Sequence, residues 1–360
     1  MNQSTTTSLP IGVLVGDGIG PEIVPAAMAV ADAAARLEEL TLDRVELPFG
    51  RGAIDTHGDP VPESTLRALD DLDLWVLGPH DSASYPAEHR RRTPGAVIRT
   101  RFGLFANLRP AQAFPGVRAT TPDIDVLIVR ENTEGLYADR NMYAGSGEFM
   151  PTPDVALAVG LITRAASERI ARVACAAARD RRGHLTIVHK ANVLTLTTGL
   201  FRDVCREVAA EYPDLVVDEQ HVDAMAAHLV RRPGDFDVVV TENLFGDVLS
   251  DLAAELAGSL GIAASVNCSD AKVMAQAAHG AAPDIAGRGI ANPVAMMLSV
   301  AMAFRRHGTI REDTAEVATG GRIEAAVADT LAASTATADL GGTASCAEFT
   351  DAVLARLADG

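Results

Sequence analysis

Short apolar runs that end in polar or flexible residues recur along this chain, and they constrain its fold more than any other feature. The clearest runs, rich in Val, Ile and Leu, cover residues 11–15, 74–77, 126–129, 185–188 and 238–240. Longer stretches of helical pattern separate them, at 21–37, 154–179, 199–211 and 243–260, the last with Asn243 as its N-cap, and an apolar tract at 292–304 predicts a core helix. Because buried parallel strands read as continuous apolar runs, this alternation predicts an α/β protein with largely parallel strands.

The residues that follow these runs indicate where a ligand would bind. GDGIG, GPH, REN, HKAN and TEN come directly after the five runs. In open α/β sheets, ligands bind outside the carboxyl ends of the strands, so these tips together predict one composite site. The first of them, GDGIGPE, is not a GxGxxG dinucleotide fingerprint, because Pro21 stands where the last glycine would be.

Composition excludes several classes of protein. The chain has 360 residues and a formal net charge of −17, which argues against a nucleic acid or an anionic membrane as partner. No apolar run reaches the roughly 18 residues of a membrane span, and Met1–Pro10 has no signal-peptide pattern. The four cysteines form no CxxC pair. We therefore expect reduced thiols and a cytoplasmic location.

Two carboxylates suggest a metal site. Asp247 and Asp251 lie four residues apart in NLFGDVLSDLAAEL, which places both on one face of a helix. The face is either solvated or holds a divalent cation, and Asp223 is a possible third ligand. No His or Cys lies beside these residues, so the metal would be Mg²⁺ or Mn²⁺.

Several basic residues near strand tips are candidates for binding an acid or moving a proton. Arg99, Arg109 and Arg130 can clamp a carboxylate or form internal salt bridges, and the residues leave both possibilities open. Lys190, one of only two lysines in the chain, and Tyr137 are candidate proton donors or acceptors.

Two segments rich in glycine, proline or small residues predict loops. Residues 142–153 (MYAGSGEFMPTP) should form a loop or arm that leaves the body of the fold. Residues 279–293 (HGAAPDIAGRGIANP) form either a flexible loop or a cofactor site with open backbone amides, in which Asp284 could accept hydrogen bonds from ribose hydroxyls.

Seven motifs in order along the chain resemble the β-decarboxylating dehydrogenases, the isocitrate/isopropylmalate dehydrogenase family. They are GDGIGPE, LFANLRP, RENTEGLY, HKANVL, NLFGDVLSDLAAEL, HGAAPDIAGRGIANP and DLGGTASCAEF. The resemblance implies the two-domain isopropylmalate dehydrogenase-like fold, which is not a Rossmann fold. It also implies a homodimer with shared active sites. Residues 1–104 with 258–360 would form a discontinuous cofactor-binding domain, and 105–257 a smaller domain that carries the metal ligands and the dimer interface.

The same resemblance implies roles for individual residues. Arg99, Arg109 and Arg130, with Thr93 nearby, would bind a di- or tricarboxylate substrate. Asp247 and Asp251 of one subunit and Asp223 of the other would hold Mg²⁺ or Mn²⁺. Lys190, also from the other subunit and relayed through Asp223, would take the hydroxyl proton, and Tyr137 would protonate C3. The cofactor would lie on His279, Gly280, Ala281, Ala282, Asp284, Ile285 and Asn292, and Asp284-Ile285, in place of the Lys-Tyr of NADP users, implies NAD.

Departures from the family pattern leave the substrate open. Gln276-Ala277 replaces the usual Glu-Pro ahead of the HG motif, and Thr93, Gly95 and Ala96 match neither the isocitrate nor the isopropylmalate pattern before Arg99. Small residues with Arg90–Arg92 nearby favour an anionic C3 substituent, hence a (homo)isocitrate-like substrate. The alternatives are 3-isopropylmalate, then tartrate or D-malate, and a regulatory ligand-binding subunit that performs no catalysis.

Overall fold

Residues 7–90, 93–137 and 147–359 are described by a computed structural model, in which the chain forms two compact units. Unit 1 comprises Met1–Phe102, Phe114–Arg118 and Gly258–Gly360, and unit 2 comprises Gly103–Ala113 and Ala119–Ala257. Unit 1 is therefore discontinuous in sequence. The five predicted apolar runs all form strands, and the α/β prediction is confirmed.

The strands of unit 1 follow the order β2-β1-β3-β12-β11. β1 pairs in parallel with β2 and β3, β3 with β12, and only β11 runs antiparallel to its neighbour β12. All four residues of β3 are buried, as expected of a central strand covered on both faces. The strands are β1 (Thr7–Leu14), β2 (Leu40–Glu46), β3 (Leu74–Leu77), β11 (Val266–Cys268) and β12 (Val273–Ala275).

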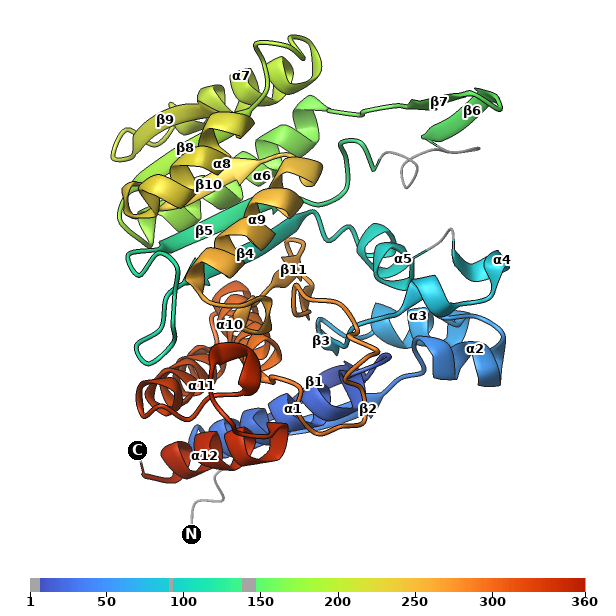
Figure 1. Cartoon of the computed structure of the whole chain (residues 1–360), viewed down its shortest axis with the longest axis vertical. Coiled ribbons are helices and arrows are strands. Elements are labelled where there is room, and N and C mark those ends of the chain that lie inside the picture. The colour runs from blue at the N-terminus through green and yellow to red at the C-terminus, as the bar shows by residue number, and fades with distance from the viewer. Residues whose placement is uncertain (1–6, 91–92, 138–146, 360) are drawn as a thin grey trace. The chain divides into compact units, whose positions relative to one another are not determined.

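The long helices of unit 1 pack together beside its sheet (Figure 1). α10 is apolar around most of its circumference and is buried between α1 and α11, which is why its sequence reads as a core helix. The helices are α1 (Gly20–Leu37), α2 (Arg51–His57), α3 (Glu63–Asp70), α4 (Ala87–Arg90), α5 (Pro94–Arg101), α10 (Val294–Arg311), α11 (Thr314–Ala332) and α12 (Cys346–Asp359).

Unit 2 has a sheet of order β4-β5-β10-β8-β9. β5, β10, β8 and β9 are parallel to one another, and β4 is antiparallel to β5. The carboxyl ends of β5, β10 and β8 therefore meet at one edge, and the REN, TEN and HKAN segments begin in the last residues of these strands. The strands are β4 (Ala106–Gln112), β5 (Asp125–Glu131), β8 (His184–His189), β9 (Val216–His221) and β10 (Val238–Thr241).

The largest difference between the predicted and the observed helices of unit 2 is at the start of α6. The predicted helix over 154–179 begins only at α6 (Arg164–Arg179), because the Thr163 hydroxyl caps the helix by accepting from the backbone N–H of Ala166. The residues before it form β7 (Val155–Ala158), which pairs with β6 (Glu148–Thr152) in an exposed hairpin that extends away from the rest of unit 2 (Figure 1). The other helices are α7 (Thr197–Ala209), α8 (Val222–Arg231) and α9 (Asn243–Ala257).

The hairpin includes the C-terminal part of the predicted 142–153 arm; residues 142–146 lie outside the described residues. Among the helices of the described ranges, none is long and apolar enough to cross a membrane.

Candidate active site

Arg109, on β4 of unit 2, points its guanidinium at the two aspartates of the predicted metal site. Its side chain is nearly buried, and its Nε donates to Asn107 Oδ1 at 2.7 Å. Its Nη1 donates to Ser250 Oγ at 2.8 Å, and it lies 3.1 Å from Asp247 Oδ1 and 3.5 Å from Asp251 Oδ1. Asn107 and Ser250, which the sequence reading missed, hold the guanidinium in place.

Arg130, at the end of β5, lies across the first turn of α9. It is 3% exposed, donates to Asn243 Oδ1 through Nε at 3.0 Å and through Nη2 at 2.6 Å, and pairs with the Asp247 carboxylate. Gly246 permits this approach, because a Cβ there would lie 2.7 Å from Arg130 Cγ. Two buried guanidiniums therefore converge on one aspartate.

The first turn of α9 is capped differently from the prediction. Asn243 was expected as N-cap, but it is the first helical residue, and its side chain binds Arg130 instead. The preceding Glu242 accepts hydrogen bonds from the backbone N–H groups of Leu244 and Phe245. Burial raises the pKa of Glu242 to about 7, against the opposing effect of those hydrogen bonds and of Arg130.

Tyr137 reaches the same aspartate from the turn after β5. Its hydroxyl donates to Asp247 Oδ2 over 3.5 Å. The turn is fixed by Gly135, which exchanges backbone hydrogen bonds with Leu161 at 2.7 and 3.0 Å and has a φ of +84°. A side chain there would also meet Glu242 Oε2 at 2.6 Å. Glycine is thus required where the chain turns toward the aspartate.

Lys190 and Asp223 form a second, separate charged group in unit 2. Lys190 follows β8, Asp223 is in the first turn of α8, and the Lys190 ammonium donates to the Asp223 carboxylate. This hydrogen bond lowers the pKa of Asp223 below its usual range. The predicted third ligand is therefore bound to Lys190, whereas Asp247 is bound to Arg109 and Arg130.

The chemistry of the aspartates suits a hard divalent cation. Asp247 and Asp251 offer carboxylate oxygens one helical turn apart. Burial raises the pKa of Asp251, and the neighbouring Asp247 raises it further although Arg109 opposes this, so a cation between the two would stabilise both charges. Across the described residues, no group of three His, Cys, Asp or Glu side chains is placed to hold a metal ion. The residues fit Mg²⁺ or Mn²⁺ with two ligands from one chain.

In unit 1, the glycine-rich turn after β1 supports the 279–293 loop. The backbone N–H of Ile19 donates to the Ala281 carbonyl at 2.9 Å, and a Cβ on Gly18 would lie 2.0 Å from that carbonyl oxygen. Glu22 accepts from the backbone N–H of Gly287 at 2.6 Å. The GDGIGPE motif therefore acts as a backbone support for this loop.

The side chains of the 279–293 loop differ in how far hydrogen bonds within the chain hold them. Asn292 donates to Asp339 at 2.9 Å and accepts from the N–H of Val294 at 3.0 Å, so it holds the end of the loop. His279 bonds through Nδ1 to Gly280 O at 3.0 Å, and its buried Nε2 has no partner. Burial lowers the pKa of His279. The orphaned nitrogen fits a loop that would receive a polar ligand such as NAD.

The remaining predicted cofactor residues lie between His279 and Asn292 in the sequence. Asp284 is exposed, and Ala282 and Ile285 are half-buried, with Ala282 at a φ of +40°. An exposed carboxylate is available to ribose hydroxyls.

Arg99 and Thr93 lie on unit 1, at α5. Thr93 precedes the helix, and its carbonyl accepts from the N–H groups of Ala96 and Val97. Arg99 is half-buried, and its charge, together with burial, lowers the pKa of His80 to about 4. Arg91 and Arg92, which the sequence reading connected with an anionic substituent, lie outside the described residues.

Asp17 is a residue whose function the sequence reading missed. Its carboxylate accepts from the backbone N–H of Arg51 at 2.7 Å and of Asp81 at 2.9 Å, and from the Tyr85 hydroxyl. It therefore joins two segments, the start of α2 and residues 81–85, to the GDGIGPE turn. The sequence feature that could have indicated this role is the position of Asp17 within the GDGIGPE motif.

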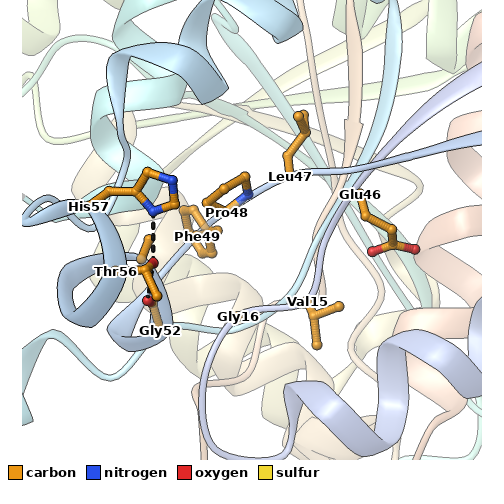
Figure 2. A pocket seen from close by; sticks show the side chains of 10 residues that line it. Val15, Gly16, Glu46, Leu47, Pro48, Phe49, Gly52, Thr56 and His57 are labelled. Atoms are coloured by element: carbon orange, nitrogen blue, oxygen red, sulfur yellow. Dashed lines mark hydrogen bonds between the residues drawn. The ribbon is translucent and has the colours of Figure 1, made fainter.

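Unit 1 also contains a cavity of about 380 Å³ that includes none of the predicted catalytic, metal or cofactor side chains. Figure 2 shows Pro48 and Phe49 on one side of it and Val15 and Gly16 on another, with the His57 ring bonded to Thr56 at 2.7 Å. The sites described above lie elsewhere.

A family profile described as isocitrate/isopropylmalate dehydrogenase matches residues 10–353. Among curated relatives, the 3-isopropylmalate dehydrogenase of Archaeoglobus fulgidus is 40% identical over 355 residues, covering 96% of this chain and 99% of that protein. The isocitrate/homoisocitrate dehydrogenase of Thermus thermophilus is 42% identical over 353 residues, covering 96% and 98%. Among solved structures, isocitrate dehydrogenase from Methylococcus capsulatus is similar with a TM-score of 0.86 and 37% identity, covering 97% of this chain and 99% of that one.

Proposed function

Because the chain belongs to the isocitrate/isopropylmalate dehydrogenase family, we propose that it catalyses the NAD-dependent oxidative decarboxylation of a malate substituted at C3. The observation that carries the proposal is the convergence of Arg109 and Arg130 on Asp247. Two buried cations held by polar side chains form a rigid receptor for carboxylate groups. The aspartates beside them offer oxygen ligands to a divalent cation.

The reaction takes a hydride from C2 and then loses the β-carboxylate as CO₂. NAD⁺ would supply the hydride acceptor, and Mg²⁺ or Mn²⁺ an electrophile that polarises the oxygen at C2. The Asp223 carboxylate takes up the hydroxyl proton and passes it to Lys190, which must first have released a proton to solvent and accepts this one as a neutral amine. Decarboxylation leaves a carbanion equivalent at C3, and the Tyr137 hydroxyl delivers a proton to it. Arg99, Arg109 and Arg130 hold the carboxylates throughout, and Thr93 borders the substituent.

The cofactor would bind to unit 1, on His279, Gly280, Ala281, Ala282, Asp284, Ile285 and Asn292. An exposed carboxylate at Asp284 favours a ribose with free hydroxyls and repels a 2′-phosphate, which supports NAD over NADP. Unit 1 would then be the cofactor domain and unit 2 the substrate and metal domain.

We place Lys190 and Asp223 in the active site of the partner subunit of a homodimer. In each chain Asp223 is bound to Lys190 and Asp247 to arginines, so the two groups are separate within unit 2. The elements that carry these groups also expose large apolar side chains: Leu196 is 85% exposed, Val193 66% and Val248 59%. Exposed apolar side chains beside both groups support an interface with a second copy there. The exposed apolar side chains of the β6–β7 hairpin, Phe149 and Met150, support a further contact with the second copy.

A (homo)isocitrate-like acid is the substrate we favour, with 3-isopropylmalate as the alternative and tartrate or D-malate after it. The reaction belongs to a reducing compartment, the cytoplasm, because all four cysteines are buried free thiols. Burial raises the pKa of Cys175 and of Cys346 to about 11, which makes both thiols unreactive.

The test is NADH absorbance at 340 nm with purified protein, Mg²⁺ and a panel of C3-substituted malates. We expect NADH and CO₂ in equal amounts, loss of activity in EDTA, recovery on adding Mn²⁺, and a higher kcat/KM with NAD⁺ than with NADP⁺. An absence of turnover across the panel, with ligand binding retained by calorimetry, would contradict the proposal and favour a regulatory subunit.

A further inference from the structure

Two neutral hydrogen-bonding side chains in unit 1 face the glycine one turn before Arg99. A Cβ built on Gly95 would lie 3.1 Å from His80 Nε2 and 3.6 Å from Gln276 Nε2. Gly95 and Arg99 are four residues apart on α5, so they share a helix face. His80 and Gln276 therefore lie against the helix face that also carries a proposed substrate clamp, Arg99.

The two side chains come together because their strands are neighbours. His80 follows β3 and Gln276 follows β12 directly, and these strands pair in parallel with Ala275 opposite Val76. Their carboxyl ends thus open at the same edge of the unit 1 sheet, where α/β proteins bind ligands.

Hydrogen bonds orient the atom that each side chain presents to Gly95. Ser82 Oγ lies 3.0 Å from His80 Nδ1, and when this hydroxyl donates, the ring proton is on Nε2, the atom that faces Gly95. Burial and the charge of Arg99 keep the imidazole neutral at pH 7. The Gln276 Oε1 accepts from Asn267 Nδ2 at 3.4 Å, which turns the amide NH₂ of Gln276 toward Gly95.

We propose that His80 and Gln276 are specificity-determining residues that bind the C3 substituent of the substrate, and that this substituent ends in an oxyanion. The inference rests on the proposed function and deepens it. Two N–H donors and the Arg99 guanidinium match the oxygens of a carboxylate or a phosphonate. Gly95 has no side chain, whereas a Cβ there would crowd His80 Nε2 at 3.1 Å, so the helix itself covers this N–H with no side chain at that position.

A branched alkyl substituent would fit this place poorly. It would cover the two N–H groups without accepting from either, and each unpaired buried donor costs about 1–3 kcal/mol. A site built to hydrogen bond its substrate rejects an analogue without the acceptor far more strongly than an apolar pocket rejects a missing methyl group. The same physics disfavours 3-isopropylmalate here.

The test compares kcat/KM for malates that carry carboxymethyl, carboxyethyl, phosphonomethyl, isopropyl or no substituent at C3. We expect the oxyanion substituents to exceed isopropyl by at least about 100-fold, since two unpaired donors at about 1.4 kcal/mol each give that ratio. The carboxylate and phosphonate arms show which oxyanion the site takes.

Two variants assign the effect to the side chains. His80→Leu and Gln276→Met should each lower kcat/KM for the oxyanion substrates by about tenfold, mainly by raising KM. The same variants should lower kcat/KM for D-malate by about threefold at most. His80→Asn, which keeps an N–H donor, should restore part of the loss for the oxyanion substrates. His57→Leu, an exposed histidine of the same unit, is the matched control. If the wild-type enzyme turns over but prefers the isopropyl substrate, or if both variants leave the ratios of kcat/KM between substrates unchanged, the inference is wrong. An absence of turnover with every substrate of the panel would instead overturn the proposed function.

Discussion

The two lysines of this chain lie in different units and donate to different groups. Lys272 of unit 1 donates to the carbonyls of Leu69, Asp70 and Leu72 at 3.2, 3.0 and 2.6 Å, and lies 5.6 Å from the Trp75 ring. Lys190 of unit 2 is half-buried, as Lys272 is, and donates to the exposed carboxylate of Asp223. A lysine whose three protons are all held is a structural cross-link, whereas one bound to a single acid can exchange a proton with it.

This contrast extends to the two units. The proposed site groups of unit 2 are charged and already paired with one another, as Arg130 is with Asp247. Those of unit 1, apart from Arg99 and Asp284, are backbone amides and neutral side chains such as His279, supported by hydrogen bonds from residues outside the site. Unit 2 is thus suited to the part of the substrate that every family reaction shares, and unit 1 to what distinguishes one substrate or cofactor from another.

Replacing Lys190 gives the largest expected effect. Lys190→Met should lower kcat by about 10³-fold, within the range for loss of a general acid or base, because no other described side chain is bonded to Asp223. The melting temperature should stay within about 2 °C of wild type, since an exposed ion pair contributes little to stability. Steady-state kinetics and a thermal melt measure both; unchanged turnover would remove Lys190 from the mechanism.

Replacing Lys272 should have the reverse effect. Lys272→Met leaves three carbonyls without their charged donor, so we expect unfolding to become easier by about 3 kcal/mol while kcat stays near wild type. Urea unfolding followed by circular dichroism measures this. If Lys272→Met is as stable as wild type but has lost its turnover, the distinction between a structural Lys272 and a catalytic Lys190 is wrong.

A buried acid of unit 2 gives a smaller, pH-dependent effect. Glu242 has its pKa raised to about 7 by burial, so the folded state keeps a proton that the unfolded chain releases near pH 4.5. Its contribution is therefore present below pH 4.5 and is lost as the pH rises through 7, at about 1.4 kcal/mol per pKa unit, or about 3 kcal/mol in all.

Glu242→Gln should accordingly flatten the fall in stability between pH 5 and 8. Glu255→Gln, on the outer part of the same α9 helix, is the control. Equal pH profiles of the free energy of unfolding for wild type and Glu242→Gln would show that the carboxyl is not protonated in the native state.

Sequence patterns alone indicated that Arg130 and the two aspartates of α9 would lie close together, for a physical reason. Strand ends and an i, i+4 spacing place Arg130, Asp247 and Asp251 from local rules alone. These local rules could not show that Arg109 and Arg130 would pair with the aspartates. A guanidinium is satisfied equally by a carboxylate of the same chain and by a carboxylate of the substrate.

The neutral side chains proposed for the unit 1 site come together through contacts between segments that are far apart in the sequence. The spacing of residues along the chain does not encode such contacts. His80 and Gln276 meet at Gly95 only because β3 and β12, about 200 residues apart, are neighbours in the sheet. Asp17 and Asp339 act as hydrogen-bond supports whose partners are set by the fold. The start of α6 was wrong because the helical pattern of residues 154–163 is weaker than their pairing with β6 and the cap at Thr163.

The most direct test of this account mixes two inactive variants. In the proposed dimer each site takes Asp247 from one subunit and Lys190 from the other, so a Lys190→Met/Asp247→Asn heterodimer keeps one intact site. Random 1:1 reassociation after mild dissociation should restore about a quarter of wild-type turnover, because half the dimers are mixed and each has one working site of two. If mixing restores nothing while mixed dimers are shown to form, Lys190 and Asp247 serve the same chain, and the shared site is wrong.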